Sequence, residues 1–315
     1  MPAGSLTSVG IGDDAAVVTT PSGSVVAAVD LLLEGRHFRR DWSSAYDIGV
    51  KAAARSLADI AAMGAVNTAL LVALAAPGTL PASWPVDLAD GLAAEASRAG
   101  AGIVGGDTAR ADSVVLSVTA LGDLAGRPPV LRSGARPGDV IAVAGPLGRS
   151  AAGLALLAAG VSADATSAAL TGLVTAHLRP SPPYQAGPEA AALGATAMID
   201  VSDGLVADLG HVAAASGVAL DIDSSSLVIG GPLGEAAALL REKSDSYGTI
   251  RGFSTHSIPL EWALTGGEDH SLVAMFPASA VLPSQWRVIG HVRAGAGVTV
   301  DGAPHAGPGG WQHFR

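Results

Sequence analysis

Five aspartates stand inside or directly after apolar segments, where a carboxylate is partly removed from water. They are Asp30, Asp59, Asp107, Asp200 and Asp203. Any one of them can be an ordinary capping or ion-paired carboxylate, and Arg55, one turn before Asp59, offers such a partner. Two unit charges 4 Å apart repel by about 4 kcal/mol at an effective dielectric constant near 20. If several of these aspartates converge, a cation must lie among them.

The composition limits which cation this can be. The chain has no cysteine, and its acidic residues are 21 aspartates and 7 glutamates. Oxygen ligands without thiolates favour Mg²⁺, Mn²⁺ or Ca²⁺, and no segment resembles the twelve-residue calcium loop of EF-hands. Mg²⁺ commonly binds one or two carboxylates together with substrate phosphates, so the sequence predicts several Mg²⁺ ions around a polyphosphate. This combination indicates phosphoryl transfer.

The usual phosphate-binding motifs are missing. Lys51 and Lys243 are the only lysines, and neither lies in a P-loop or protein-kinase motif. Gly10 to Ala15 matches a dinucleotide fingerprint in its letters, but a hairpin is expected after it where that fold needs a helix. The glycine-rich turn from Gly145 to Ser150 follows an apolar segment and opens a helix, which makes it a weak phosphate candidate.

Length, charge and hydropathy exclude several classes of protein. The 315 residues favour two domains, and 49% hydrophobic against 15% charged residues excludes extensive disorder. A net charge of −10 argues against a nucleic-acid partner. The longest apolar run, Ala69 to Ala76, is too short to span a bilayer, and no basic residue precedes Arg36. We therefore expect a cytoplasmic protein with no membrane partner.

Periodicity and turn residues predict mixed helices and strands on both sides of a Gly, Pro and Arg-rich boundary at 126–139, which gives domains 1–130 and 131–315. In the first half the predicted elements are a hairpin of strands 15–20 and 25–30, helices 47–63 and 85–99, and strands 70–75 and 113–121. In the second half they are strands 140–144 and 219–222, helices 188–193 and 206–215, and a helix that follows Ser150 and ends near Ala159. The polar stretch 241–257 predicts an exposed, poorly ordered loop.

Seven short motifs, in this order, resemble those of the thiamine-monophosphate kinase family. They are Gly10 to Val17, Asp30 with Glu34 to Phe38, Leu57 to Ala65, Gly105 to Thr108, Arg132 to Ala135, Asp200 to Leu205, and Gly266 to Asp269. The C-terminal Gly310 to Phe314 is also similar to the end of that family, so the resemblance covers nearly the whole chain. Where the family usually has Tyr-Glu after the last motif, this chain has His270 and Ser271.

The resemblance implies an α/β fold with mixed sheets. It is the two-domain fold of the superfamily that also contains aminoimidazole ribonucleotide synthetase, selenophosphate synthetase and a hydrogenase-maturation protein, which bind ATP without a P-loop. It further implies that the N-terminal sheet pairs across a homodimer. In this arrangement the N-terminal domain binds ATP and Mg²⁺, and the C-terminal domain completes the nucleotide and thiamine-phosphate site.

The resemblance also assigns roles to individual residues. The implied Mg²⁺ ligands are Asp14, Asp30, Asp59, Asp107, Asp200 and Asp203, of which Asp30, Asp59, Asp107 and Asp203 are the catalytic set. The implied ATP contacts are Gly105, Gly106, Asp107, Arg132 and Ser202. The implied thiamine-phosphate contacts are His37, Glu268 and Trp311. An indole can stack on an aminopyrimidine, and a carboxylate can accept a hydrogen bond from its amino group.

These observations predict ATP-dependent phosphorylation of thiamine monophosphate to thiamine diphosphate by direct in-line transfer. The predicted partners are both substrates, several Mg²⁺ ions and a second copy of the chain. One alternative is another ATP-dependent enzyme of the superfamily, similar to the purine-pathway synthetase. A second is a non-catalytic protein that binds nucleotide or thiamine phosphate, although so many mutually repelling carboxylates are unnecessary for binding alone. A dinucleotide-dependent oxidoreductase ranks last.

Overall fold

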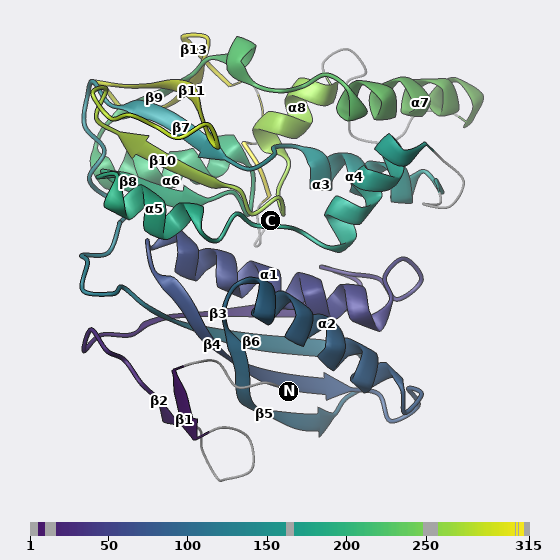
Figure 1. Cartoon of the computed structure of the whole chain (residues 1–315). Helices are drawn as coiled ribbons and strands as arrows, with labels where there is room; N and C mark the ends of the chain where they lie inside the picture. The colour runs from purple at the N-terminus through teal and green to yellow at the C-terminus, as the bar shows by residue number, and fades with distance from the viewer. Residues whose placement is uncertain are drawn as a thin grey trace. The chain divides into compact units, whose positions relative to one another are not determined.

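A computed structural model describes residues 6–9, 17–161, 167–247, 258–305, 307 and 309–311. The chain divides into two compact units (Figure 1). The first unit contains Met1–Val130 together with Pro183–Ala192, and the second contains Leu131–Pro182 and Leu193–Arg315. No helix of the described residues is long and apolar enough to cross a membrane.

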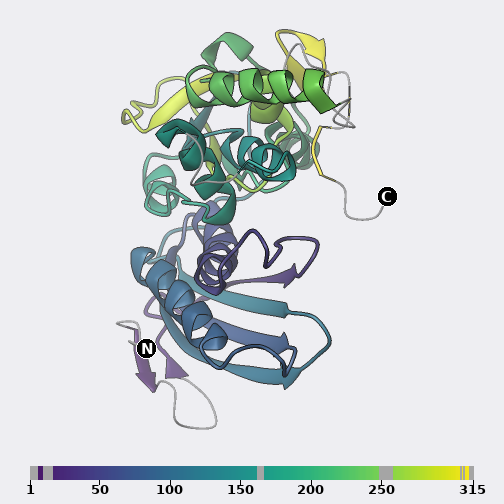
Figure 2. The same ribbon diagram turned by 90° about the vertical axis from the view of Figure 1, so that its right-hand side faces the viewer.

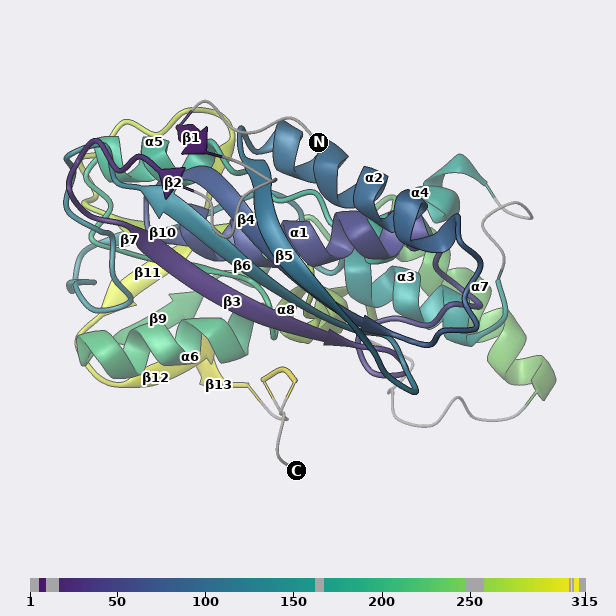
Figure 3. The same ribbon diagram turned by 90° about the horizontal axis from the view of Figure 1, so that it is seen from below.

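The first unit is a four-stranded sheet with two helices on one face. The strands follow the order β3 (Val26–Leu33), β6 (Val115–Asp123), β4 (Val66–Ala76) and β5 (Gly102–Arg110). Only β4 and β5 run parallel. Helices α1 (Ala45–Ala62) and α2 (Trp84–Arg98) lie on the same side of the sheet (Figure 2). Figure 3 views the sheet from the face that these two helices leave uncovered.

Helix α1 begins and packs as its sequence predicts. Ser44 and Asp47 form a capping box, in which the Ser44 hydroxyl accepts from the Asp47 N–H and the Asp47 carboxylate accepts from the Ser44 N–H. A Cβ on Gly49 would lie 2.2 Å from the Leu88 carbonyl oxygen, and one on Gly91 would lie 2.1 Å from that of Tyr46. The two helix backbones therefore touch, and the alanine-rich face of α1 reaches the sheet.

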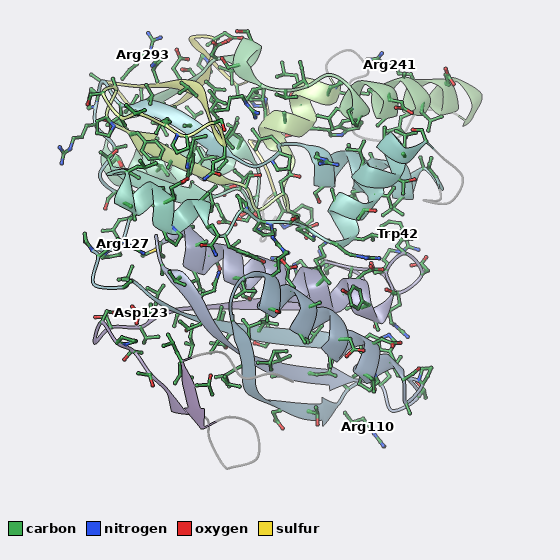
Figure 4. All side chains as sticks on the ribbon, viewed as in Figure 1. Trp42, Arg110, Asp123, Arg127, Arg241 and Arg293 are labelled. Atoms are coloured by element: carbon green, nitrogen blue, oxygen red, sulfur yellow. The ribbon has the colours of Figure 1, made fainter. Side chains whose placement is uncertain are left out.

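The predicted hairpin of strands 15–20 and 25–30 is wrong. Strand β2 (Val17–Val18) pairs with β1 (Thr7–Val9), whereas β3 pairs along its whole length with β6. The intervening turn is bound to the end of β6, because Asp123 accepts from the Ser22 N–H at 3.5 Å (Figure 4). Strand β3 has eight residues that can bury one face under α1, and this longer pairing prevails over the local turn.

Segment Pro183–Ala192 belongs to the first unit. Its helix α5 (Ala186–Ala192) packs so tightly on α1 that a Cβ on Gly187 would lie 2.0 Å from the Ala61 carbonyl oxygen. The buried Tyr184 hydroxyl donates to Glu95 Oε1 of α2 at 2.5 Å. Glu95 also pairs with Arg98, whose guanidinium lies 4.6 Å from the centre of the Tyr184 ring. This network fixes the segment to α2.

The second unit is built on a seven-stranded mixed sheet in the order β13-β12-β9-β11-β7-β10-β8, in which only β12 and β9 run parallel. The strands are β7 (Val140–Ala144), β8 (Ala197–Asp200), β9 (Ala219–Ile222), β10 (Leu272–Phe276), β11 (Trp286–Arg293), β12 (Gly297–Val300) and β13 (Ala303–Pro304). Its helices are α3 (Arg149–Ala158), α4 (Ala168–Leu178), α6 (Leu205–Ser216), α7 (Pro232–Tyr247) and α8 (Ile258–Thr265), with a 3-10 turn at Ser224–Ser226.

Two hydrophobic clusters organise this second unit. Leu209 and Val212 of α6 pack with Val143, Ile199 and Val273 of the sheet. Helices α3, α4, α7 and α8 form a separate apolar cluster with one another. Strands β7 and β8 end, and β10 begins, at the edge of the sheet from which the loops to α3 and α6 leave.

The expected loop at 241–257 is wrong for residues 241–247, which are the last turns of α7, while residues 248–257 lie outside the described residues. Leu233, Ala236, Ala237 and Leu240 form a buried stripe at helical spacing against α3 and α4, and the helix continues from there into its polar end. The other predicted helices and strands are confirmed within a few residues. Strands β1, β5, β8, β10, β11, β12 and β13 and helices α4, α7 and α8 were not predicted.

Candidate active site

Two of the predicted catalytic aspartates lie where α1 covers the sheet. Asp30 of β3 accepts from the Ser56 hydroxyl at 3.0 Å, and its Oδ1 lies 3.8 Å from the Arg55 guanidinium. Both partners come from α1, and Asp59 follows them one turn later, half-buried. The Asp30 side chain keeps 22% exposure, so it is anchored without being enclosed.

Strand β5 carries the predicted nucleotide-binding glycines. The pairing of β4 and β5 shifts between Leu70 and Leu71, and a Cβ on Gly106 would lie 1.9 Å from the Val72 carbonyl oxygen. Only glycine fits there. Asp107 follows at an exposed position, and its Oδ1 accepts from the Thr108 N–H at 2.8 Å.

The register separates Asp30 from Asp107. Asp30 lies opposite Val118, which lies opposite Val72, which lies opposite Gly106. Because successive side chains alternate, Asp107 falls on the other face of the sheet. Within the described part of the chain no three acidic or histidine side chains form a metal-binding group. Asp14, the sixth predicted ligand, lies outside the described residues.

His37 lies in the turn that follows β3. The Leu33 N–H donates to its Nδ1 at 2.9 Å, so the ring carries its hydrogen on Nε2, which suits a phosphate oxygen. The same turn is fixed by Glu34, which pairs with Arg40 at 2.5 Å and accepts from the Val114 N–H at 3.0 Å. Further on, the Arg39 guanidinium lies 4.3 Å from the centre of a Trp42 ring.

In the second unit, Asp200 is the last residue of β8, and the loop that follows holds Ser202 and Asp203. The N–H groups of residues 202, 203 and 204 donate to one oxygen of Asp208, at 3.0, 3.1 and 3.0 Å. Asp208 lies in the first turn of α6 and is buried. Burial first, and then the charge of nearby Asp200, raise the pKa of Asp208 to about 8. Sequence reasoning missed this residue.

The donor set around this loop suits a divalent cation. After burial, the charges of Asp200 and Asp203 both raise the pKa of Asp208, so several carboxyl groups lie close together here. Asp200 is buried, and His270 Nδ1 lies 3.0 Å from its Oδ2. Carboxylate oxygens of this kind are ligands that Mg²⁺ prefers.

A second loop, residues 266–270, lies against the first. The Glu268 N–H donates to the Ser202 carbonyl oxygen at 2.8 Å, and the His270 N–H donates to that of Val201 at 2.9 Å. Glu268 has a φ of 64°, which is uncommon for a residue with a side chain. Paired loops therefore bring together the predicted nucleotide contact Ser202 and the predicted substrate contact Glu268.

Trp311 is attached to the same loop. Its N–H donates to the Asp203 carbonyl oxygen at 2.9 Å, and a Cβ on Gly310 would lie 2.2 Å from that oxygen. The Trp311 side chain is 58% exposed. The backbone thus fixes this C-terminal segment at a position where residue 311 is largely exposed.

Arg132 occupies an exposed position in the connection to β7. Its carbonyl oxygen accepts from the Ser216 hydroxyl at 3.0 Å, and that hydroxyl oxygen lies 3.1 Å from the Gly134 N–H. Ser216 is the last residue of α6, so the end of this helix fixes the backbone of the Arg132 segment.

The glycine-rich turn from Gly145 to Ser150 already binds an anion of the protein itself. Asp269 accepts from the N–H groups of Gly148, at 2.5 Å, and Ser150, at 2.8 Å. Burial raises the pKa of Asp269 to about 7. Two of the N–H groups that a phosphate would use are therefore occupied. The role of Asp269 was not predicted, although it lies in one of the quoted motifs.

Comparisons with known proteins agree with this architecture. Residues 12–124 match the AIR synthase related protein family, N-terminal domain, and residues 136–250 match its C-terminal domain. The thiamine-monophosphate kinase of Mycobacterium tuberculosis is 49% identical over 306 residues, covering 97% of this chain and 85% of that protein.

Solved structures give the same result. A thiamine-monophosphate kinase from Stenotrophomonas maltophilia aligns with a TM-score of 0.80 at 35% identity, covering 95% of this chain and 92% of that one. A structure described as AaThiL complexed with AMPPCP and TMP aligns with a TM-score of 0.80 at 33% identity, covering 96% and 92%. The predicted two-domain fold is confirmed, and the chain belongs to the thiamine-monophosphate kinase family of AIR synthase related proteins.

Proposed function

We propose that this chain transfers the γ-phosphoryl group of ATP to thiamine monophosphate, giving thiamine diphosphate and ADP. The observation that carries the proposal is the arrangement of Ser202, Glu268 and Trp311 around one loop. It occurs in a chain 33% identical to a protein whose structure is described as complexed with AMPPCP and TMP.

The reaction needs positioning more than proton transfer. The acceptor is a phosphate that is ionised at neutral pH, so its oxygen attacks the γ-phosphorus in line while the bond to ADP breaks, and no general base is required. Mg²⁺, when bound, neutralises charge on the β and γ phosphates. Asp30, Asp59, Asp107 and Asp203 are the catalytic carboxylates that would hold several such ions, with Asp14 and Asp200 completing the ligand set. Asp30 and Asp107 would belong to different ions, because they lie on opposite faces of the sheet.

The remaining residues orient the two substrates. For thiamine monophosphate, the Glu268 carboxylate accepts from the amino group of the pyrimidine, Trp311 stacks on that ring, and His37 donates from Nε2 to the phosphate. For ATP, the proposed contacts are Gly105, Gly106, Asp107, Arg132 and Ser202. The exposed indole and the bound Nδ1 of His37 support these roles.

We further propose that the enzyme is a homodimer that pairs the uncovered faces of the first unit's sheet. On this face Val29, Leu31 and Leu33 of β3 are 64%, 55% and 37% exposed, and Leu71 of β4 is 38% exposed. Contiguous apolar side chains at this level of exposure mark an interface. Sedimentation of the purified chain should give twice the monomer mass, and an active monomer would overturn this pairing.

A coupled assay tests the reaction directly. The purified chain, ATP, Mg²⁺ and thiamine monophosphate should yield one thiamine diphosphate for each ADP. Omitting Mg²⁺ should abolish turnover if the carboxylates act as proposed. ATP consumption that does not depend on thiamine monophosphate, or the absence of thiamine diphosphate at any Mg²⁺ concentration, would overturn the proposal.

A further inference from the structure

A buried histidine lies beside the proposed substrate carboxylate. His177, in the last turn of α4, is 6% exposed, and its Nδ1 lies 3.6 Å from Glu268 Oε2. The same nitrogen lies 3.1 Å from the hydroxyl oxygen of Ser150, which is also buried. A polar ring is thus held between a hydroxyl and a carboxylate in an otherwise apolar helix cluster.

The packing of α3 against α4 determines where this ring lies. A Cβ on Gly153 would lie 2.1 Å from the Leu173 carbonyl oxygen and 3.0 Å from the His177 Cβ. The two helix backbones are therefore in contact at Gly153, with no room for a side chain between them. This close approach directs His177 to the start of α3, where Ser150 lies.

The start of α3 is also where the Glu268 loop is attached. Ser150 donates its N–H to Asp269, the neighbour of Glu268, at 2.8 Å. Glu268 itself has a left-handed φ of 64°, a conformation that costs free energy and persists where surrounding contacts hold it. Asp269 fixes the backbone of this loop, and His177 lies beside the Glu268 side chain, which is 22% exposed.

We infer that His177 is a positioning residue for substrate recognition. A carboxylate accepts from an amino group best when the group lies near its plane. His177 Nδ1 lies within hydrogen-bond distance of the Ser150 hydroxyl, at 3.1 Å, and at 3.6 Å from Oε2 it makes a close polar contact with Glu268, beyond hydrogen-bond distance, that limits the orientation of this carboxylate. His177 would thereby favour a pyrimidine that carries an amino group over one that carries an oxo group at the same position. This inference rests on the proposed function, in which Glu268 receives the aminopyrimidine.

A double-mutant cycle tests the inference. The variants are His177→Phe, which keeps a ring of similar shape, His177→Asn, which keeps an N–H near the Nδ1 position, Glu268→Gln, and His177→Phe combined with Glu268→Gln. For each we would measure kcat, KM for ATP, and KM for thiamine monophosphate and for its 4-oxo analogue, oxythiamine monophosphate. Circular dichroism melting checks that each variant folds.

His177→Phe should raise KM for thiamine monophosphate about 10-fold, with KM for ATP changed less than about 2-fold. His177→Asn should recover most of the loss. In the Glu268→Gln background the further change to Phe should have almost no effect, because His177 acts through that carboxylate. KM for oxythiamine monophosphate should differ less between the native chain and His177→Phe than KM for thiamine monophosphate does. If His177→Phe does not fold, His177→Leu takes its place.

Two results would overturn the inference. Equal increases in KM for both substrates with a lowered melting temperature would show that His177 only packs α4. Independent, multiplying effects of His177→Phe and Glu268→Gln would show that it does not act through Glu268. The proposed role of Glu268 fails separately: if Glu268→Gln alone leaves KM for thiamine monophosphate unchanged, that role falls and this inference falls with it.

Discussion

The two units hold their proposed site residues in different ways. In the first unit, Asp30, Asp59 and Asp107 lie on regular elements, namely β3, α1 and β5. In the second unit, Ser202, Asp203 and Glu268 lie on loops that are bound to buried carboxyl groups. Asp208 binds three N–H groups of the 202–204 segment, and Asp269 binds two at the start of α3.

This difference separates residues whose replacement should reduce turnover from residues whose replacement should reduce stability. Where a strand or helix sets the position, a polar side chain can be replaced by an isostere without disturbing its neighbours. Where a loop depends on a buried acceptor, the loss of that acceptor leaves several N–H groups unsatisfied. We therefore expect substitutions in the first unit to reduce turnover and substitutions of the second unit's acceptors to reduce stability.

The largest expected effect is on turnover in the first unit. Asp107→Asn and Asp59→Asn should each lower kcat by about 10²–10³-fold, by analogy with the loss of one preorganised electrostatic group. The melting temperature should stay within a few degrees of that of the native chain. Asp112→Asn, at an exposed turn outside the proposed site, is the matched control. Near-native turnover at saturating Mg²⁺ would remove the altered residue from the catalytic set.

The next effect is on stability in the second unit. Asp208→Ala removes the shared acceptor of three N–H groups and should lower the free energy of unfolding by roughly 2–4 kcal/mol. Asp208→Asn keeps a carbonyl oxygen in place and should lose much less. Urea denaturation of both variants measures the difference. Equal losses would show that the loop does not depend on this oxygen.

A pH-dependent effect is expected at Asp269. Its pKa rises from 3.8 to about 7 through burial, so between these values the folded chain binds a proton that the unfolded chain has lost. This contribution to stability is complete below about pH 4 and declines as the pH rises to about 7, by up to about 1.4 kcal/mol per pH unit.

The comparison with Asp269→Asn isolates this group. Urea denaturation of both proteins would be measured at several pH values from about 5.5 to about 7. As the pH rises over this range, the native chain should lose stability relative to the variant. A difference between the two proteins that stays constant over this range would contradict the raised pKa. If the native chain instead gained stability relative to the variant as the pH rises, the pKa of Asp269 would be lowered and not raised.

The smallest effect is expected at Trp311. Stacking contributes about 0.5–1.5 kcal/mol, so Trp311→Ala should raise KM for thiamine monophosphate by roughly 2- to 12-fold and leave KM for ATP nearly unchanged. Because its side chain is 58% exposed, the melting temperature should change little. A lowered melting temperature with an unchanged KM would show that the indole packs the C-terminal segment instead.

The sequence was most informative where a signal is local. The helix predicted over 47–63 is α1 within two residues at each end, and the helix predicted over 206–215 is α6, which ends before Gly217 with its left-handed φ of 67°. Strand β5 escaped prediction because Gly105 and Gly106 lower the β propensity of a segment that the neighbouring backbone of β4 nevertheless requires.

The same criterion separates the site residues that the sequence predicted from those that it did not. The motifs identified Ser202, Glu268 and Trp311, which the loops bring together. Asp269 and His177 escaped because they contact segments far away in the sequence, and a single sequence gives no local sign of such a partner. Asp208 accepts from N–H groups only four to six residues away, but its sequence position alone does not show that it is buried against them. His177 lies 91 residues before Glu268, and only the contact of α3 with α4 makes them neighbours.

Segment Pro183–Ala192 affects the order in which the protein can fold during synthesis. A ribosome releases β7, α3 and α4 of the second unit before the residues that complete the first. Until Tyr184 emerges, Glu95 lacks the hydroxyl that binds it, and the α1 backbone at Ala61 lacks its contact with Gly187. The N-terminal unit is therefore finished only after part of its successor has been made, and a fragment ended at Val130 would expose this unfilled surface.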